Sequence, residues 1–169
     1  MTATTFSRRQ LNLGGAIACA AMMAFAIYAE RVLGLLPCNM CILERIGVSA
    51  LGVAFLLAAL HNPASTGARV YGLLIAVVAA IGTAVAARHV WMQMQPVGSL
   101  GSCGADFSAM LEMMSPVKAV KRVLMGGAEC QAITWTLFGV SMPVWVVISS
   151  AALGVAGLVG NSILGRPAR

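Results

Sequence analysis

Two cysteines, Cys38 and Cys41, are separated by two residues and stand just ahead of a long apolar run. Pro37 precedes the pair, and residues 46–60 are wholly apolar or small. A cysteine pair with this spacing at the start of a helix is typical of a redox site, because the helix dipole and a nearby cation favour thiolate over thiol. At the edge of a bilayer, such a pair can reach water-soluble thiols on one side and lipid-soluble electron acceptors on the other.

Arg45 follows Cys41 by four residues, so the two side chains share one face of a helix. The guanidinium keeps its charge at ordinary pH and can therefore stabilise both a Cys41 thiolate and a reduced, anionic acceptor. An arginine that snorkels to the membrane interface is the alternative, and the adjacent cysteine pair favours the functional interpretation. Glu44 is interpreted as an interfacial acid or as the ion-pair partner of Arg45.

Three more cysteines complete the set of five. Cys103 and Cys130 lie in a long polar segment, whereas Cys19 lies within an apolar run and is interpreted as a small buried hydrophobe. Four cysteines outside that run permit three pairings, and the sequence does not choose among them. A bond between Cys103 and Cys130 would close a loop of about 28 residues and could stabilise it by roughly 3–4 kcal/mol. A bond between Cys38 and Cys41 closes almost no loop, so stability does not explain it.

Histidines give little sign of a metal site, and none is predicted. A structural zinc site often combines two close cysteine pairs or added histidines, and neither histidine here is near the cysteines in sequence. His89 ends the third apolar run and is interpreted as an interfacial side chain. If the third helix packs against the second, His89 reaches the level of Cys41 and can hydrogen-bond the carbonyl of an electron acceptor.

The composition requires a membrane. Of the 169 residues, 60% are hydrophobic and 9% are charged, whereas a soluble domain carries about a quarter charged residues. The formal net charge of +6 is therefore interpreted as a sign of membrane topology and of contact with anionic lipid. No basic patch is interleaved with aromatic residues, so nucleic-acid binding is not expected. We expect one membrane domain over residues 1–169.

Four apolar segments are each close to the ~20 residues that cross a ~30 Å hydrocarbon core. The predicted fold is an all-α membrane protein: a four-helix transmembrane bundle with a long periplasmic loop that carries a short amphipathic helix. The amphipathic helix is expected between Phe107 and Leu124, lying flat on the membrane, with an ordinary solvated helix as the alternative. The expected spans are about 11–29, 42–60, 70–87 and 144–164, and the expected periplasmic loops are 30–41 and 88–143.

An even number of spans places both termini on one side of the membrane. The Arg8-Arg9 pair beside the first span places that side in the cytoplasm, although the basic residues are nearly balanced between the two sides. Every acidic residue falls on the other side. The cysteines at the loops and helix ends then face the oxidising periplasm of a bacterial inner membrane, where disulfides persist.

Several features combine into one pattern: Pro37-Cys38-x-x-Cys41-Ile42 with Glu44-Arg45, then Cys103 and Cys130, the four spans, and the stretch Trp135 to Trp145 with Phe138-Gly139 and Met142-Pro143. This pattern resembles the DsbB family of disulfide bond formation proteins. Glu30, eight residues before Cys38, departs from the Gln expected in many members, which bears on a secondary contact.

The resemblance implies a thiol:quinone oxidoreductase that reoxidises a periplasmic DsbA-type dithiol oxidase. It implies that Cys103 forms the mixed disulfide with reduced DsbA and that Cys130 is its intramolecular partner. Cys38 then exchanges with that pair, and Cys41 faces the quinone with Arg45 in support.

The implied cofactor is a membrane quinone, either ubiquinone or menaquinone, with His89 as a weaker contact. The implied partners are the DsbA-type oxidase, the membrane quinone pool and the lipid bilayer. Three alternatives stay open: a DsbB-like paralogue with a dedicated partner, a four-helix quinone reductase related to vitamin K epoxide reductase, and a non-catalytic membrane protein whose loop is stapled by disulfides.

Overall fold

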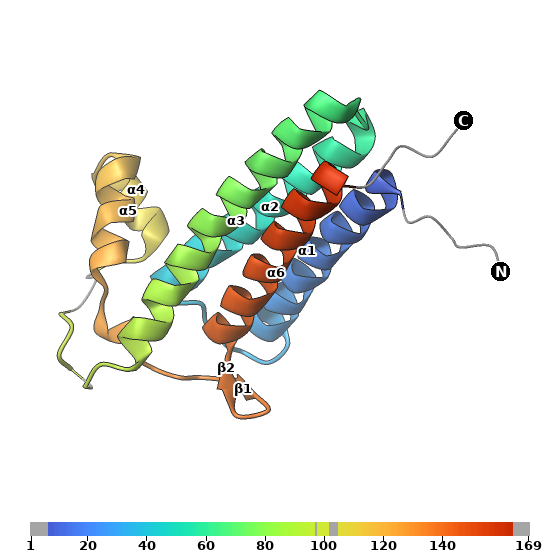
Figure 1. Cartoon of the computed structure of the whole chain (residues 1–169). Coiled ribbons are helices and arrows are strands. Elements are labelled where there is room, and N and C mark those ends of the chain that lie inside the picture. Colours follow the sequence, from blue (N-terminus) through green and yellow to red (C-terminus); the bar gives the residue numbers. More distant parts are fainter. Residues whose placement is uncertain (1–6, 97, 102–104, 164–169) are drawn as a thin grey trace.

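Four long helices run alongside one another in the computed structural model, which describes residues 7–96, 98–101 and 105–163 (Figure 1). Between α3 and α6 the chain forms two short helices, one 3-10 turn and a small antiparallel hairpin. The elements are α1 (Arg8–Arg31), α2 (Asn39–His61), α3 (Ser65–Gln93), α4 (Phe107–Met113), α5 (Pro116–Met125), η1 (Ala128–Cys130), β1 (Thr136–Leu137), β2 (Val140–Ser141) and α6 (Met142–Ile163).

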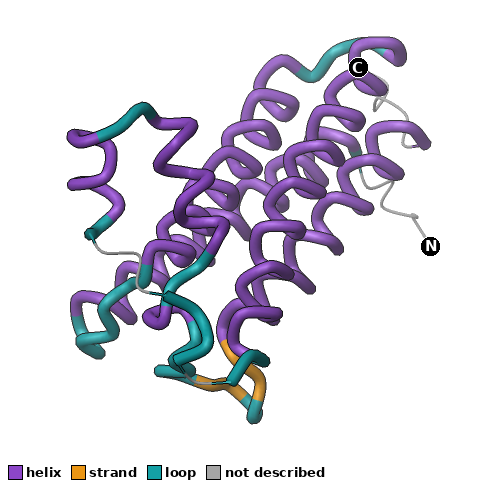
Figure 2. Tube along the Cα trace, turned by 90° about the vertical axis from the view of Figure 1, so that its left-hand side faces the viewer, coloured by secondary structure: helices purple, strands orange, loops and turns teal. Residues whose placement is uncertain are grey.

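The predicted fold class is confirmed. All four long helices are long and apolar enough to cross a membrane. Their outward faces carry large exposed apolar side chains, such as Leu56, Leu73 and Ile81, which suits contact with lipid and not with water. The start of α1, the end of α6 and the α2–α3 connection lie at one end of the bundle, and the hairpin and most loops lie at the other (Figure 2).

Helix α3 is longer than the span predicted for it. It continues to Gln93 instead of stopping at 87, so that Arg88 and His89 belong to the helix and not to the loop expected from residue 88. The apolar run ends at residue 87, but a helix can continue through an arginine if the guanidinium finds partners. Arg88 donates to the carbonyl of Met125 at 3.3 Å and lies 4.1 Å from the ring centroid of Trp91.

One amphipathic helix was predicted from Phe107 to Leu124, and the structure has two in its place. The chain breaks at Ser115, because a following proline disfavours the helical conformation. Pro116 then starts α5, where its missing N–H leaves no hydrogen bond unmade.

Helix α5 is amphipathic and its apolar face is turned toward the bundle. Ala119 and Val123 are fully buried and pack in one cluster with Met40 of α2 and Met92 of α3. The opposite face carries the exposed basic residues Lys118, Lys121 and Arg122. The loop is therefore anchored by packing on the same end of the bundle that holds the start of α2.

Small residues let the long helices approach closely. α3 packs most extensively against α6, and α1 against α2. A Cβ atom added at Gly154 of α6 would stand 2.6 Å from the Cβ of Ala79 on α3. At the other end of the bundle, Asn12 of α1 and Asn161 of α6 exchange side-chain hydrogen bonds of 2.9 and 3.0 Å. Close backbone contact and buried amide pairs are both typical of membrane bundles.

Gly154→Ala should destabilise the bundle by about 1–3 kcal/mol, because the Cβ of Ala79 has no rotamer by which to move away. The matched control is Gly82→Ala on α3, where an added Cβ meets nothing within 4 Å. The free energy of unfolding in detergent micelles measures both. Equal stability of the two variants would contradict the close α3–α6 contact.

Candidate functional site

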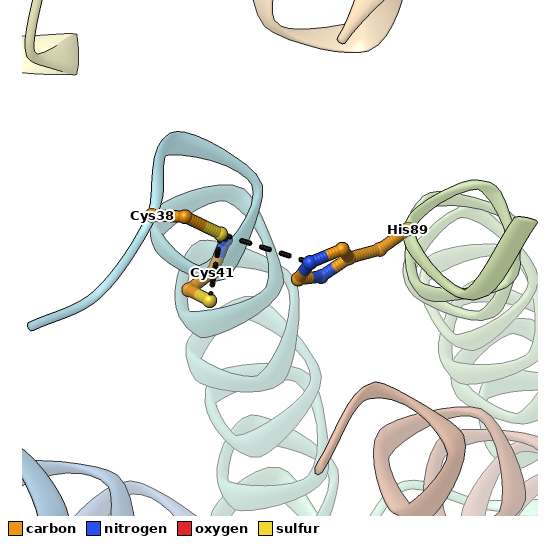
Figure 3. A group of neighbouring side chains, drawn as sticks. All are labelled: Cys38, Cys41 and His89. Atoms are coloured by element: carbon orange, nitrogen blue, oxygen red, sulfur yellow. Dashed lines mark hydrogen bonds between the residues drawn. The ribbon is translucent and has the colours of Figure 1, made fainter. Parts of the chain in front are cut away.

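Cys38 and Cys41 lie at the first turn of α2. Cys38 is the N-cap residue, and its Sγ accepts a hydrogen bond from the backbone N–H of Cys41 at 3.3 Å. The cap turns the two sulfurs toward each other, 2.9 Å apart (Figure 3). A disulfide has an S–S length of about 2.05 Å, so oxidation of this dithiol to a disulfide requires only small side-chain movements.

His89 faces this pair from α3. Its Nε2 lies 3.7 Å from the Cys38 Sγ (Figure 3). Its Nδ1 donates to the Glu44 carboxylate at 2.7 Å, and the two side chains are only 3% and 7% exposed. Glu44 therefore fixes the ring and aims Nε2 at the sulfurs. Ionisable side chains inside a membrane bundle usually pair in this way and mark functional positions.

Arg45 pairs with Glu30 of α1, so the interpretation of Glu44 as its partner is wrong. The Arg45 Nη1 donates to the Glu30 carboxylate, and its Nη2 donates to the carbonyl of Ala26 at 3.1 Å. Successive residues of a helix point about 100° apart. Arg45 consequently faces α1, whereas Glu44 faces α3.

Cys130 reaches the cysteine pair from the loop. It is fully buried, and its sulfur interacts with the Cys38 thiol and with the backbone N–H of Met40. The hydrogen bond from the Cys38 thiol lowers the pKa of Cys130, and the same contact raises the pKa of Cys38. Of these two cysteines, Cys130 is therefore the one that more readily becomes a thiolate. A thiolate placed in this way can attack a disulfide that includes Cys38.

The turn η1 holds Cys130 in this position. Gly126 ends α5 with φ at 94°, and a Cβ there would lie 2.9 Å from the Met92 Sδ, so glycine fits best. Gln131 ties η1 to the segment after α3: its side chain accepts from the N–H of Gly98 at 3.1 Å and donates to the carbonyl of Pro96 at 2.7 Å. Residue 103 lies outside the described residues, so the predicted Cys103 is not placed.

A cavity of about 400 Å³ lies beside the cysteines, between the four long helices and the segment that leads into α6. Its walls are mostly apolar, and Cys41, Arg45 and His89 are among the side chains that line it. Trp135 also lines the cavity, and its ring lies 5.3 Å, centroid to centroid, from the ring of Phe25 on α1. The structure therefore brings four residues that the sequence predicted for the site to one cavity: Cys38, Cys41, Arg45 and His89.

Sequence reasoning missed two acidic residues at this site. Glu44 was not connected with His89, and Glu30 was noted only as a departure from the family pattern. The available signal was their position: Glu44 lies inside an otherwise apolar run, where an unpaired charge is costly, and Glu30 stands at the end of another such run. Cys19 lies apart from the site, buried between α1 and α2 at 2% exposure.

Comparison with known proteins identifies the family of the chain. The family model for disulfide bond formation protein DsbB matches residues 8–160. The chain belongs to the DsbB family. Disulfide bond formation protein B of Xanthomonas axonopodis pv. citri is 43% identical over 154 residues, which cover 90% of each chain. That of Xylella fastidiosa (strain 9a5c) is 41% identical over 160 residues, which cover 94% of this chain and 92% of the relative. This DsbB-family chain is accordingly a membrane protein of disulfide bond formation.

In the Cys41→Ser/Cys103→Ser variant, mild oxidation should join Cys38 to Cys130, because the two side chains pack in one cluster. Mass mapping of peptides under non-reducing conditions detects this bond. A control variant that also carries Cys130→Ser should yield only free thiols within the chain. Free Cys38 and Cys130 after oxidation of the first variant would contradict the placement of η1.

Proposed function

We propose that this protein is a thiol:quinone oxidoreductase of the bacterial inner membrane that reoxidises a periplasmic DsbA-type dithiol oxidase. One observation carries the proposal: Cys130 packs in one cluster with Cys38, and the Cys38 and Cys41 sulfurs lie 2.9 Å apart at an apolar cavity between membrane-long helices. A purely structural staple leaves this arrangement without a reason, since a Cys38–Cys41 bond closes almost no loop.

The residues around the cavity fit a quinone head group. The volume of about 400 Å³ is in the range of small-molecule sites, and the mostly apolar walls suit a ring with a hydrocarbon tail. Arg45 supplies N–H groups at the wall, His89 adds a polar ring edge there, and the Arg45 charge stabilises negative charge that develops on an acceptor. A quinone bound here supplies a two-electron acceptor next to Cys41.

Electrons enter through the loop cysteines. A thiolate of reduced DsbA attacks Cys103 of a Cys103–Cys130 disulfide, so that a mixed disulfide forms and Cys130 leaves with the electron pair. The Cys130 thiolate then attacks Cys38. A Cys130–Cys38 bond forms, the Cys38–Cys41 bond breaks, and Cys41 keeps the electron pair as a thiolate at the cavity wall. The low pKa of Cys130 and its contact with Cys38 support this direction of attack.

Two further exchanges complete the cycle. The second DsbA thiol displaces Cys103 from the mixed disulfide and leaves DsbA oxidised. Cys103 then attacks Cys130, which restores the loop disulfide and frees Cys38. The Cys38–Cys41 disulfide would re-form with loss of two electrons and two protons, for which a quinone held beside Arg45 and His89 would supply the acceptor. DsbA would then have lost one electron pair.

We place the cysteine end of the bundle in the periplasm. The start of α1 then lies in the cytoplasm with Arg8 and Arg9, and the basic pair beside the first span usually sets the orientation even though the basic residues of the two sides are nearly balanced. The exchange cysteines thereby face the compartment in which disulfides persist.

Cys41→Ser should abolish quinone reduction, because no thiolate remains at the cavity wall. Cys103→Ser should block exchange with a DsbA-type protein yet retain quinone binding. Anaerobic quinone absorbance with reduced DsbA-type protein measures turnover, and co-purified quinone measures binding. Cys19→Ala, remote from the site, is the control and should turn over normally. Full turnover by Cys41→Ser would refute the role given to Cys41.

Arg45→Met should raise the KM for quinone roughly ten- to hundredfold, because a hydrogen bond to a charged group contributes about 1.5–3 kcal/mol. Glu30→Gln is the matched control: its amide oxygen still accepts from the Arg45 guanidinium, so the KM should change less than about threefold. Steady-state kinetics at saturating DsbA-type protein measure both. An unchanged KM in Arg45→Met would exclude contact between Arg45 and the quinone.

A further inference from the structure

Three side chains at the site converge on one point. The Sγ atoms of Cys38 and Cys41 and a ring nitrogen of His89 all lie within 4.8 Å of one another (Figure 3). Two thiolates and one imidazole are a ligand set that zinc prefers, with Zn–S near 2.3 Å and Zn–N near 2.0–2.1 Å. The 3.7 Å between the His89 Nε2 and the Cys38 Sγ suits two neighbouring ligands of one tetrahedral ion.

Glu44 provides a second and independent indication. A histidine that binds a metal almost always donates its other ring N–H to a carboxylate, carbonyl or water, which fixes the tautomer and the ring orientation. The His89 Nδ1 donates to the buried Glu44 carboxylate at 2.7 Å, and this leaves the Nε2 lone pair directed at the sulfurs. The sequence analysis expected no metal because no histidine is near the cysteines in sequence. The fold supplies one from 51 residues after Cys38.

We propose that the dithiol form of this site binds a thiophilic divalent cation, zinc in particular, through Cys38, Cys41 and His89. Binding displaces two thiol protons and involves no electron transfer. The disulfide form lacks both thiolate ligands and does not bind. The bound ion coordinates the Cys41 sulfur, which would otherwise reduce the acceptor, so zinc inhibits the enzyme. The binding rests on the three side chains alone, whereas the inhibition rests on the proposed function.

Cobalt titration tests the binding. The full-length Cys103→Ser/Cys130→Ser variant, in micelles, is reduced and freed of reductant under anaerobic conditions, and Co²⁺ is added. The expected result is one Co²⁺ per chain, with sulfur-to-cobalt charge-transfer bands and the visible bands of a tetrahedral ion. Zinc should displace the cobalt, and protein with Cys38 joined to Cys41 should give no bands.

Matched variants test the ligands. In the same background, His89→Ala should weaken cobalt binding at least tenfold and change the visible bands. Glu44→Gln should weaken binding by roughly ten- to hundredfold, as loss of the carboxylate partner of a ligating histidine does. His61→Ala is the control: that histidine lies at the other end of α2, bonded to Tyr71, and its loss should leave the affinity unchanged.

Inhibition is measured on the unmodified chain, as quinone reduction with and without added Zn²⁺ and after a chelator. Activity should fall with zinc and return with the chelator. The proposal would be overturned if the reduced Cys103→Ser/Cys130→Ser variant reduces added quinone once in metal-free buffer and yet gives no cobalt bands. Identical cobalt bands after His89→Ala would also overturn it. Bound zinc that leaves turnover unchanged would overturn the inhibition. Cobalt binding by a chain that never reduces quinone would count against the proposed function alone and would support the metal site.

Discussion

The hydrogen bond between Glu44 and His89 joins α2 to α3 at the level of the cysteine pair, and the site is built around it. Both groups are buried among apolar helices, where a polar group left without its hydrogen-bond partner costs about 1–3 kcal/mol, and more if the group is charged. The bond fixes how α2 is rotated about its axis. That rotation sends Arg45 toward Glu30 of α1 and leaves Cys41 at the cavity wall.

The loop completes the site by packing and not by covalent attachment among the described residues. Val123 and Met92 bury the apolar face of α5 against the end of the bundle, and the turn at Gly126 delivers Cys130 to Cys38. Under the proposed function, these cysteines pass electrons by successive disulfide exchange. The proposed metal site uses two of the same cysteines, so its disulfide form would not bind thiophilic metals.

Much of the fold could be predicted from the sequence, because an apolar run of about 20 residues in a membrane has few structures available to it. The position of Cys38 and Cys41 at a helix start followed from their spacing. The rotation of each helix could not be predicted, so the partners of Glu44 and Arg45 were assigned wrongly or missed. Pro116 signals a helix break in the sequence, but the apolar residues on both sides of it follow one helical period, and a single helix was predicted. The contact between Cys130 and Cys38 was implied by family resemblance alone, since no local pattern encodes it.

The central claim is that the Cys38–Cys41 pair gives its electrons directly to a quinone in the adjoining cavity. A single-turnover experiment tests it most directly: chain reduced at Cys38 and Cys41 is mixed anaerobically with a soluble quinone, and quinol and disulfides are counted together by absorbance and mass mapping. The account predicts one quinol for each Cys38–Cys41 disulfide formed. Quinol that forms while Cys38 and Cys41 stay reduced, or a reduced pair that leaves the quinone untouched, would contradict it.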